Sequence, residues 1–206
     1  MYPIPVPTHE VYDSPEDKNF EGISKSYIWL GSGGLVHKGL DLVLEAFADM
    51  PDYKLTVCGP VDAVYERHFR KAYASELYDC PNIDTIGWTD IASEQFRDIA
   101  NRSLGLIYPS ASEGQSGAVV TCMQAGLVPV VSYESGVDVE DFGLVLPACD
   151  VDTIRRTITA LSAESASDLR ARAVGAWNRA RDRHTTDSYG IEFRAMLESV
   201  LAENAS

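Results

Sequence analysis

Basic residues are scarce in this chain of 206 residues, which has 17 Lys and Arg against 31 Asp and Glu and a formal net charge of −14. A nucleic-acid-binding domain needs a basic surface that displaces the counterions of the phosphates, and this composition argues against one. It argues equally against a polybasic membrane anchor. A small anionic ligand needs only a local cationic pocket, so the composition does not exclude a ligand of this class.

Cysteines are few, and they are scattered at Cys58, Cys80, Cys122 and Cys149. No two of them form a Cys-x-x-Cys pair, and none has a histidine at metal-ligand spacing, so no zinc site is predicted. We expect reduced, mostly buried thiols and a cytoplasmic protein. The sequence also has no run of about 18 apolar residues and no signal-peptide pattern at its start, so no membrane-spanning helix is predicted.

Short apolar runs alternate with stretches of helical periodicity, and 45% of the residues are hydrophobic, enough for a sizeable core. This alternation predicts an α/β fold, a Rossmann-like doubly wound parallel sheet with C-terminal helices. Residues 1–25 are polar and aperiodic and are predicted to be an arm or the remnant of an interdomain linker, with the domain at 26–206. Strands are expected at 27–31, 53–58, 83–87, 104–108, 128–132 and 143–146. Helices are expected from 38 to 50 and at 62–77, 93–101, 118–125, 150–162 and 167–202.

Ligands of such sheets bind beyond the carboxyl ends of the strands, which directs attention to the loops 32–37, 88–92 and 109–117. The first loop, GSGGLVHKG, is neither a dinucleotide fingerprint nor a Walker A loop. Gly33 and Gly34 allow the backbone to approach a ligand there. Lys38 stands at the expected start of a helix, where its charge opposes the helix dipole. It is either an anion ligand or a solvated lysine beside a permissive turn.

The third loop, YPSASEGQSG, leads from a strand into a helix. Ser116 is the predicted N-cap, and the N–H groups of residues 115–117 form a candidate anion site at the helix start. Glu113 can accept hydrogen bonds from hydroxyl groups. The alternative is a capped helix beside a surface glutamate. In the second loop, Trp88 is either a packing residue or a stacking surface for a base. An acidic cluster at Glu134, Asp138, Glu140 and Asp141 is better explained as a solvated loop than as a metal site.

Residues 27–161 resemble the C-terminal, donor-binding domain of GT-B glycosyltransferases of the retaining family 4. Four segments carry the resemblance: LVHKGLDLVLEAF, IGWTD, YPSASEGQSGAVVTCMQAGLVPVVS and GLVL. The resemblance implies one half of a GT-B enzyme that transfers a hexosyl group from a nucleotide sugar to an acceptor hydroxyl, in polysaccharide biosynthesis. The acceptor domain would be a separate N-terminal unit, in cis or on a partner chain, so this chain alone is expected to be inactive. Peripheral membrane association of the whole enzyme stays open.

The resemblance also implies roles for single residues. Lys38 would contact the donor phosphate and Glu113 the sugar hydroxyls, and these two would be the catalytic residues. No tightly bound metal or other cofactor is expected, because lysine and helix-end N–H groups would stabilise the diphosphate. The donor site implied in full is Ser32, Gly33, Gly34, Lys38, Trp88, Thr89, Glu113, Gly114, Gln115, Ser116, Gly117 and Thr121.

Two positions depart from the family pattern. Thr121 stands where the family has a second glutamate that binds ribose, and Ser32 stands where it often has an arginine. A threonine is a weaker, neutral partner for a ribose hydroxyl, and a serine supplies no charge. These departures keep open a non-catalytic sugar-nucleotide-binding or scaffolding module with a degenerate donor site. A further alternative is another sugar-nucleotide enzyme of GT-B shape, such as an epimerase.

Overall fold

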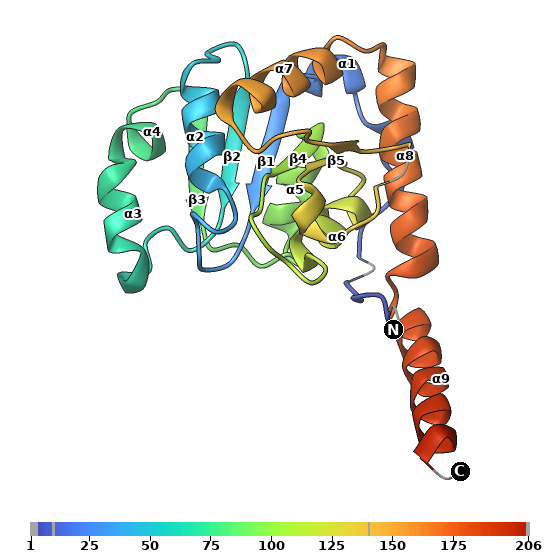
Figure 1. The fold of residues 1–206 in the computed structure, drawn as a ribbon. Helices are drawn as coiled ribbons and strands as arrows, with labels where there is room; N and C mark the ends of the chain where they lie inside the picture. Colours follow the sequence, from blue (N-terminus) through green and yellow to red (C-terminus); the bar gives the residue numbers. More distant parts are fainter. Residues whose placement is uncertain (1–3, 10, 140, 205–206) are drawn as a thin grey trace.

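Six parallel strands form the central sheet in the order β3-β2-β1-β4-β5-β6 (Figure 1). The computed structural model describes residues 4–9, 11–139 and 141–204. The strand order reverses between β1 and β4, which is the switch point of a doubly wound sheet. The predicted Rossmann-like fold is therefore confirmed. The strands are β1 (Ser26–Leu30), β2 (Lys54–Cys58), β3 (Ile83–Gly87), β4 (Gly105–Tyr108), β5 (Val128–Val131) and β6 (Leu144–Val145).

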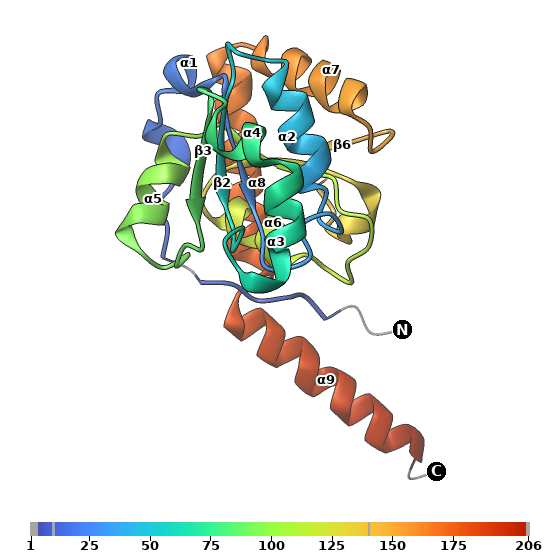
Figure 2. The ribbon, with the colours of Figure 1, turned by 90° about the vertical axis from the view of Figure 1, so that its left-hand side faces the viewer.

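Helices cover both faces of the sheet (Figure 2). One layer contains α2 (Leu40–Ala48), α3 (Arg67–Ala72), α4 (Ala74–Tyr78) and α7 (Val151–Ser162). The opposite layer contains α5 (Glu94–Asn101), α6 (Gly117–Gln124) and α8 (Ala166–Arg183). Since every residue of β4 and β5 is buried, these strands are uniformly apolar rather than alternating.

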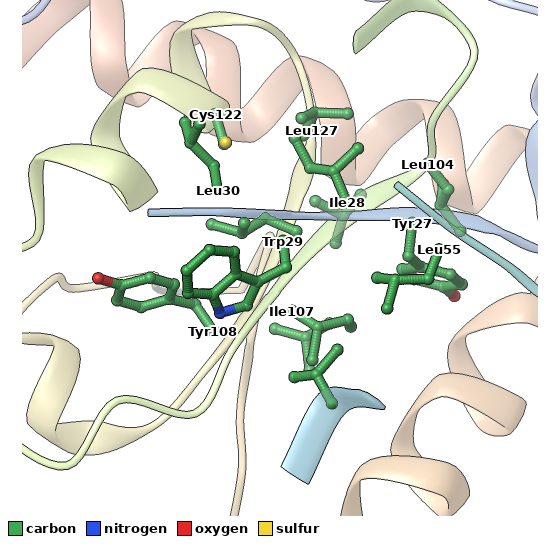
Figure 3. Packing of buried hydrophobic residues seen from close by; sticks show 14 of the residues in the cluster. Tyr27, Ile28, Trp29, Leu30, Leu55, Leu104, Ile107, Tyr108, Cys122 and Leu127 are labelled. Carbon is green, nitrogen blue, oxygen red and sulfur yellow. The ribbon is translucent and has the colours of Figure 1, made fainter. Parts of the chain in front are cut away.

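The core continues directly into the carboxyl edge of the sheet. Tyr27, Ile28 and Trp29 of β1 are fully buried, and the Trp29 ring stacks on Tyr108 of β4 with centroids 6.4 Å apart (Figure 3). Because Tyr108 is the last residue of its strand, this packing fixes the point where the following loop starts. The loops at this edge thus stand on a rigid base.

Two predicted helices are divided in the structure. The stretch 62–77 is a 3-10 turn, η2 (Val64–Glu66), followed by α3 and α4, because Tyr73 leaves helical geometry at φ −109° and ψ 29°. The stretch 167–202 is α8 followed by α9 (Thr186–Asn204). His184 ends α8, and the Thr185 hydroxyl accepts from Ser188 N–H and caps α9. A single long helix was therefore the wrong prediction.

Helix α9 extends away from the body of the domain (Figure 2). Its Ile191 and Leu201 side chains are 71% and 68% exposed. No helix in the described part of the chain is long and apolar enough to cross a membrane.

The predicted arm has more structure than its sequence suggests. It contains η1 (Pro15–Asp17), α1 (Phe20–Ile23) and buried side chains at Tyr12, Phe20 and Ile23. Residues 12–23 of the arm therefore pack onto the domain, where η1 and α1 contact α8 and the Tyr12 ring contacts Phe96 of α5. The role as a linker to another domain stays a prediction.

All four cysteines are free, but only Cys58 and Cys122 are buried. Cys80 is partly buried and Cys149 is exposed, so the expectation of mostly buried thiols holds for half of them. Burial raises the pKa of the Cys58 thiol to about 11, which keeps it protonated and unreactive at neutral pH.

Candidate functional site

The candidate site lies where β1 and β4 end, at the switch point of the sheet. Trp29 donates its indole N–H to the Lys38 carbonyl oxygen at 3.2 Å, which anchors the loop after β1. Gly39 has φ +69°, and a Cβ atom there would overlap the Pro109 carbonyl. Only glycine allows the two loops to approach so closely. Lys38 was predicted to stand at the start of a helix, but α2 begins at Leu40 with Gly39 as its N-cap. Lys38 therefore lies in the loop before the helix.

Lys38 and Glu113 form an ion pair between these loops. The Lys38 Nζ lies 2.5 Å from Glu113 Oε1, and the side chains are only 14% and 20% exposed. Tyr108 donates its hydroxyl to the same Glu113 oxygen at 2.9 Å. The alternatives of a solvated lysine and a surface glutamate are therefore wrong. The structure joins the two residues predicted to be catalytic.

Protonation follows from this pairing. Burial alone lowers the pKa of Lys38, but its hydrogen bonds and charge interactions with Glu113 and Tyr108 together outweigh the burial, so the pKa is raised. For Glu113, burial alone raises the pKa, but the hydrogen bonds from Lys38 and Tyr108 outweigh it, so the pKa is lowered. Both groups are charged at neutral pH. The ammonium is therefore available as a cation for an anionic ligand.

The loop from Glu113 to α6 is held by the segment η3 (Tyr133–Ser135) that follows β5. Glu113 N–H donates to the Glu134 carbonyl and Ser116 N–H to the Ser135 carbonyl, each at 2.9 Å. Ser116 caps α6 as predicted, accepting from Val119 N–H. The Ser116 N–H, however, is already bonded, so this member of the predicted anion site is not free to receive a phosphate.

A pocket of about 720 Å³ opens beside these loops. Six predicted donor-site residues line it: Ser32, Gly33, Trp88, Thr89, Gly117 and Thr121. Trp88 is 73% exposed, so the alternative interpretation of Trp88 as a packing residue is wrong. The pocket is also lined by Pro7, Thr8 and His9 of the N-terminal arm, by Cys58 and by Tyr65, which were not predicted.

The glycine-rich loop has an unpredicted neighbour in η2. The Glu66 carboxylate accepts from Gly34 N–H at 2.7 Å. The Tyr65 ring lies over Gly33, so close that a Cβ atom added to Gly33 would be 3.0 Å from the ring. Both residues fall inside the stretch predicted as one helix, where no sequence signal sets them apart. An acidic side chain thus holds an N–H group of the loop that was predicted to approach the ligand.

Glu113 also lines a second cavity, of about 740 Å³, on the side of β6. Glu134 and Asp138 of the acidic cluster face this cavity too, while Glu140 lies outside the described residues. Within residues 4–9, 11–139 and 141–204, no three His, Cys, Asp or Glu side chains are grouped to hold a metal ion. Of the remaining predicted residues, Gly114 packs against Gly136, and the Gln115 side chain accepts from Val6 N–H.

Comparisons with solved structures show the same fold in larger proteins. The chain is 17% identical to sucrose-phosphate synthase from Thermosynechococcus elongatus, with a TM-score of 0.75 over 97% of this chain and 52% of that one. It is 16% identical to trehalose 6-phosphate synthase from Burkholderia multivorans, with a TM-score of 0.75 over 98% of this chain and 51% of that one. It is also 16% identical to Anabaena HepE in complex with UDP-glucose, with a TM-score of 0.71 over 85% of this chain and 49% of that one. The chain therefore spans about half the length of these structures.

A search of curated proteins found no match. A family model, Glycosyl transferases group 1, matches residues 25–164, which is more than half of the chain and includes β1 to β6, Lys38 and Glu113. The carboxyl-edge site described above lies within the matched range, apart from the arm residues and Thr186 of α9, which also lines the first pocket. The chain belongs to the group 1 glycosyltransferases.

Proposed function

We propose that this chain is the C-terminal, nucleotide-sugar-binding domain of a retaining hexosyltransferase of the family 4 type. The observation that carries the proposal is the Lys38–Glu113 ion pair at the switch point. It joins two loops whose residues Ser32, Gly33 and Gly117 line a pocket large enough for a nucleotide. A cation and a hydroxyl-accepting carboxylate stand together where a sugar meets its diphosphate. Similarity to a structure with UDP-glucose bound supports this class of donor.

In the proposed reaction the bond between the sugar and the diphosphate breaks, and the sugar passes to an acceptor hydroxyl. Lys38 would stabilise the negative charge that develops on the leaving phosphate, together with the N-terminus of α6. Glu113, held by Tyr108, would accept hydrogen bonds from sugar hydroxyls. We propose that these groups stabilise the leaving group without a tightly bound metal.

We propose that the acceptor is bound by an N-terminal domain that the chain itself does not contain, so that the chain alone is inactive. The proposal is supported by the solved neighbours, of whose length this chain covers about half. The four free cysteines support a cytoplasmic location for the enzyme.

A second candidate is a binding or scaffolding module with a degenerate donor site. It is favoured by the neutral side chains of Ser32 and Thr121, which line the pocket without adding charge. Such a module would bind the nucleotide weakly and transfer no sugar. The two candidates therefore differ in affinity and in activity once the acceptor domain is present.

A thermal-shift panel with UDP, GDP, ADP and their glucose conjugates tests the proposal. A ligand at 100 times its Kd adds about 2.7 kcal/mol to the free energy of unfolding. For a domain of this size, the expected rise in Tm is roughly 5 to 10 °C. We expect a selective rise with one nucleotide. No rise with any of them at millimolar concentration would contradict the proposed donor site.

A further inference from the structure

Residues 4–9 of the N-terminal arm cross the carboxyl edge of the sheet (Figure 2). Val6 N–H donates to the Gln115 side chain at 2.5 Å, and the Val6 carbonyl oxygen lies 2.9 Å from His184 Nδ1. Thr8 N–H donates to the His184 carbonyl oxygen at 3.1 Å. The arm is therefore fixed from two sides, by the loop before α6 and by the end of α8.

This crossing brings a side chain of the arm into the nucleotide-sized pocket. Thr8 Oγ1 lies 2.8 Å from Thr121 Oγ1, and both threonines line the pocket. Each hydroxyl has one donor and two acceptor sites, and their mutual bond uses one donor and one acceptor. The pair therefore keeps one donor and several acceptor sites. Two adjacent hydroxyls of a ligand form a vicinal diol, which needs such a combination.

The position of the pair indicates which part of a nucleotide it meets. Gly33 and Gly117 line the pocket at the glycine-rich loop and the N-terminus of α6, where a phosphate is favoured. Trp88 lines it at the end of β3, on the far side of β2 in the sheet order, where its exposed ring can stack on a base. Thr121 follows Gly117 by one helical turn. The sugar of the nucleotide joins phosphate and base, so the hydroxyl pair is placed for the ribose.

We propose that Thr8 is a donor-binding residue: with Thr121 it binds the ribose diol of the nucleotide, and the arm forms one wall of the pocket. The inference rests on the proposed function and extends it to a segment outside the matched family range. It also gives the neutral Thr121 a partner.

The test compares Thr8→Val with Thr8→Ser by titration calorimetry, using UDP, GDP and ADP and their 2′,3′-dideoxy analogues. Valine keeps the shape of threonine and removes the hydroxyl, while serine keeps the hydroxyl. The loss of a neutral hydrogen bond is expected to raise the Kd of the bound ribonucleotide about fivefold in Thr8→Val. Thr8→Ser is expected to bind like the wild type, and the dideoxy analogue to bind equally to all three proteins.

Each other result has a distinct meaning. If Thr8→Val loses as much affinity for the dideoxy analogue as for the ribonucleotide, Thr8 only positions the arm. If its affinity for the ribonucleotide is unchanged, Thr8 does not contact the ligand. Tighter binding in Thr8→Val would show that the arm competes with the nucleotide. Any of these overturns the inference and leaves the donor site intact. If the wild type binds none of the three nucleotides, the proposed function fails and the inference fails with it.

Discussion

Replacing Lys38 with methionine is expected to raise the Kd of the nucleoside diphosphate by about 10- to 100-fold. A hydrogen bond to a charged group contributes about 1.5 to 3 kcal/mol, and each 1.4 kcal/mol is a factor of ten in Kd. Methionine keeps the apolar stem of the lysine and removes only the ammonium. Glu113 holds the Lys38 ammonium at the switch point. Among the described residues that line the two neighbouring cavities there is no lysine or arginine that could replace it. Titration calorimetry with UDP, GDP and ADP measures the effect.

Two controls separate a phosphate contact from a change in the pocket. The matched variant is Lys71→Met, an exposed lysine on α3, which is expected to bind the nucleotide like the wild type. The matched ligands are the nucleosides without phosphate, whose affinity should be the same in Lys38→Met and wild type. If the nucleoside loses as much affinity as the nucleotide, Lys38 shapes the pocket and does not bind the phosphate.

The sheet was predictable because its strands are buried on both faces. Strands such as β4 and β5 are short, uniformly apolar runs that end at a polar loop, and their positions follow from this pattern within one or two residues. Helix divisions were not predictable in the same way. The break at His184 depends on local geometry and on the Thr185 cap, and periodicity continues across it.

The candidate site was predicted in its residue types but not in its contacts. Lys38 and Glu113 are 75 positions apart in sequence. They are brought together by the packing of their two loops, through the close approach of Gly39 to Pro109 and the hydrogen bond from Ala111 N–H to the His37 carbonyl. Sequence also gave no reason to expect that Ser116 N–H is bonded to η3 or that Gly34 N–H is bonded to Glu66. Such contacts depend on how distant loops pack, which no local pattern records.

The structure and contacts of the N-terminal arm were the least predictable from the sequence. Its short helices have too few residues for a periodic signal, and Thr8 belongs to a stretch without any pattern. Lys18 is the clearest case. A lysine in a polar segment is ordinarily a solvated residue, but here its amino group enters the domain and donates to the carbonyl oxygens of Ala100, Ala125 and Gly126 at 3.0, 2.9 and 3.2 Å. These carbonyls belong to the C-terminal ends of α5 and α6.

Replacing Lys18 with methionine is therefore expected to lower the free energy of unfolding at pH 8 by roughly 2 to 4 kcal/mol. The substitution leaves buried carbonyl oxygens at two helix ends without their donor and loosens the arm from the domain. For a chain of this size the fall in Tm is roughly 10 °C. Thermal unfolding followed by circular dichroism measures it. Lys71→Met is again the matched control, because its side chain is exposed, and its Tm should change by about 1 °C or less.

The stabilising effect of Lys18 should also depend on pH. Burial lowers the pKa of Lys18 from its ordinary 10.5 to about 7 in the folded protein. Between these two values the unfolded chain binds a proton that the folded chain does not, so stability from this residue rises as the pH rises from about 7 towards 10.5. Below pH 7 the lysine is charged in both states, and the cost of burying that charge is fully present. The difference in Tm between wild type and Lys18→Met is thus expected to be larger at pH 9 than at pH 6.5. A difference that stays constant over this range would mean that the three carbonyl oxygens compensate the burial and keep the ammonium charged.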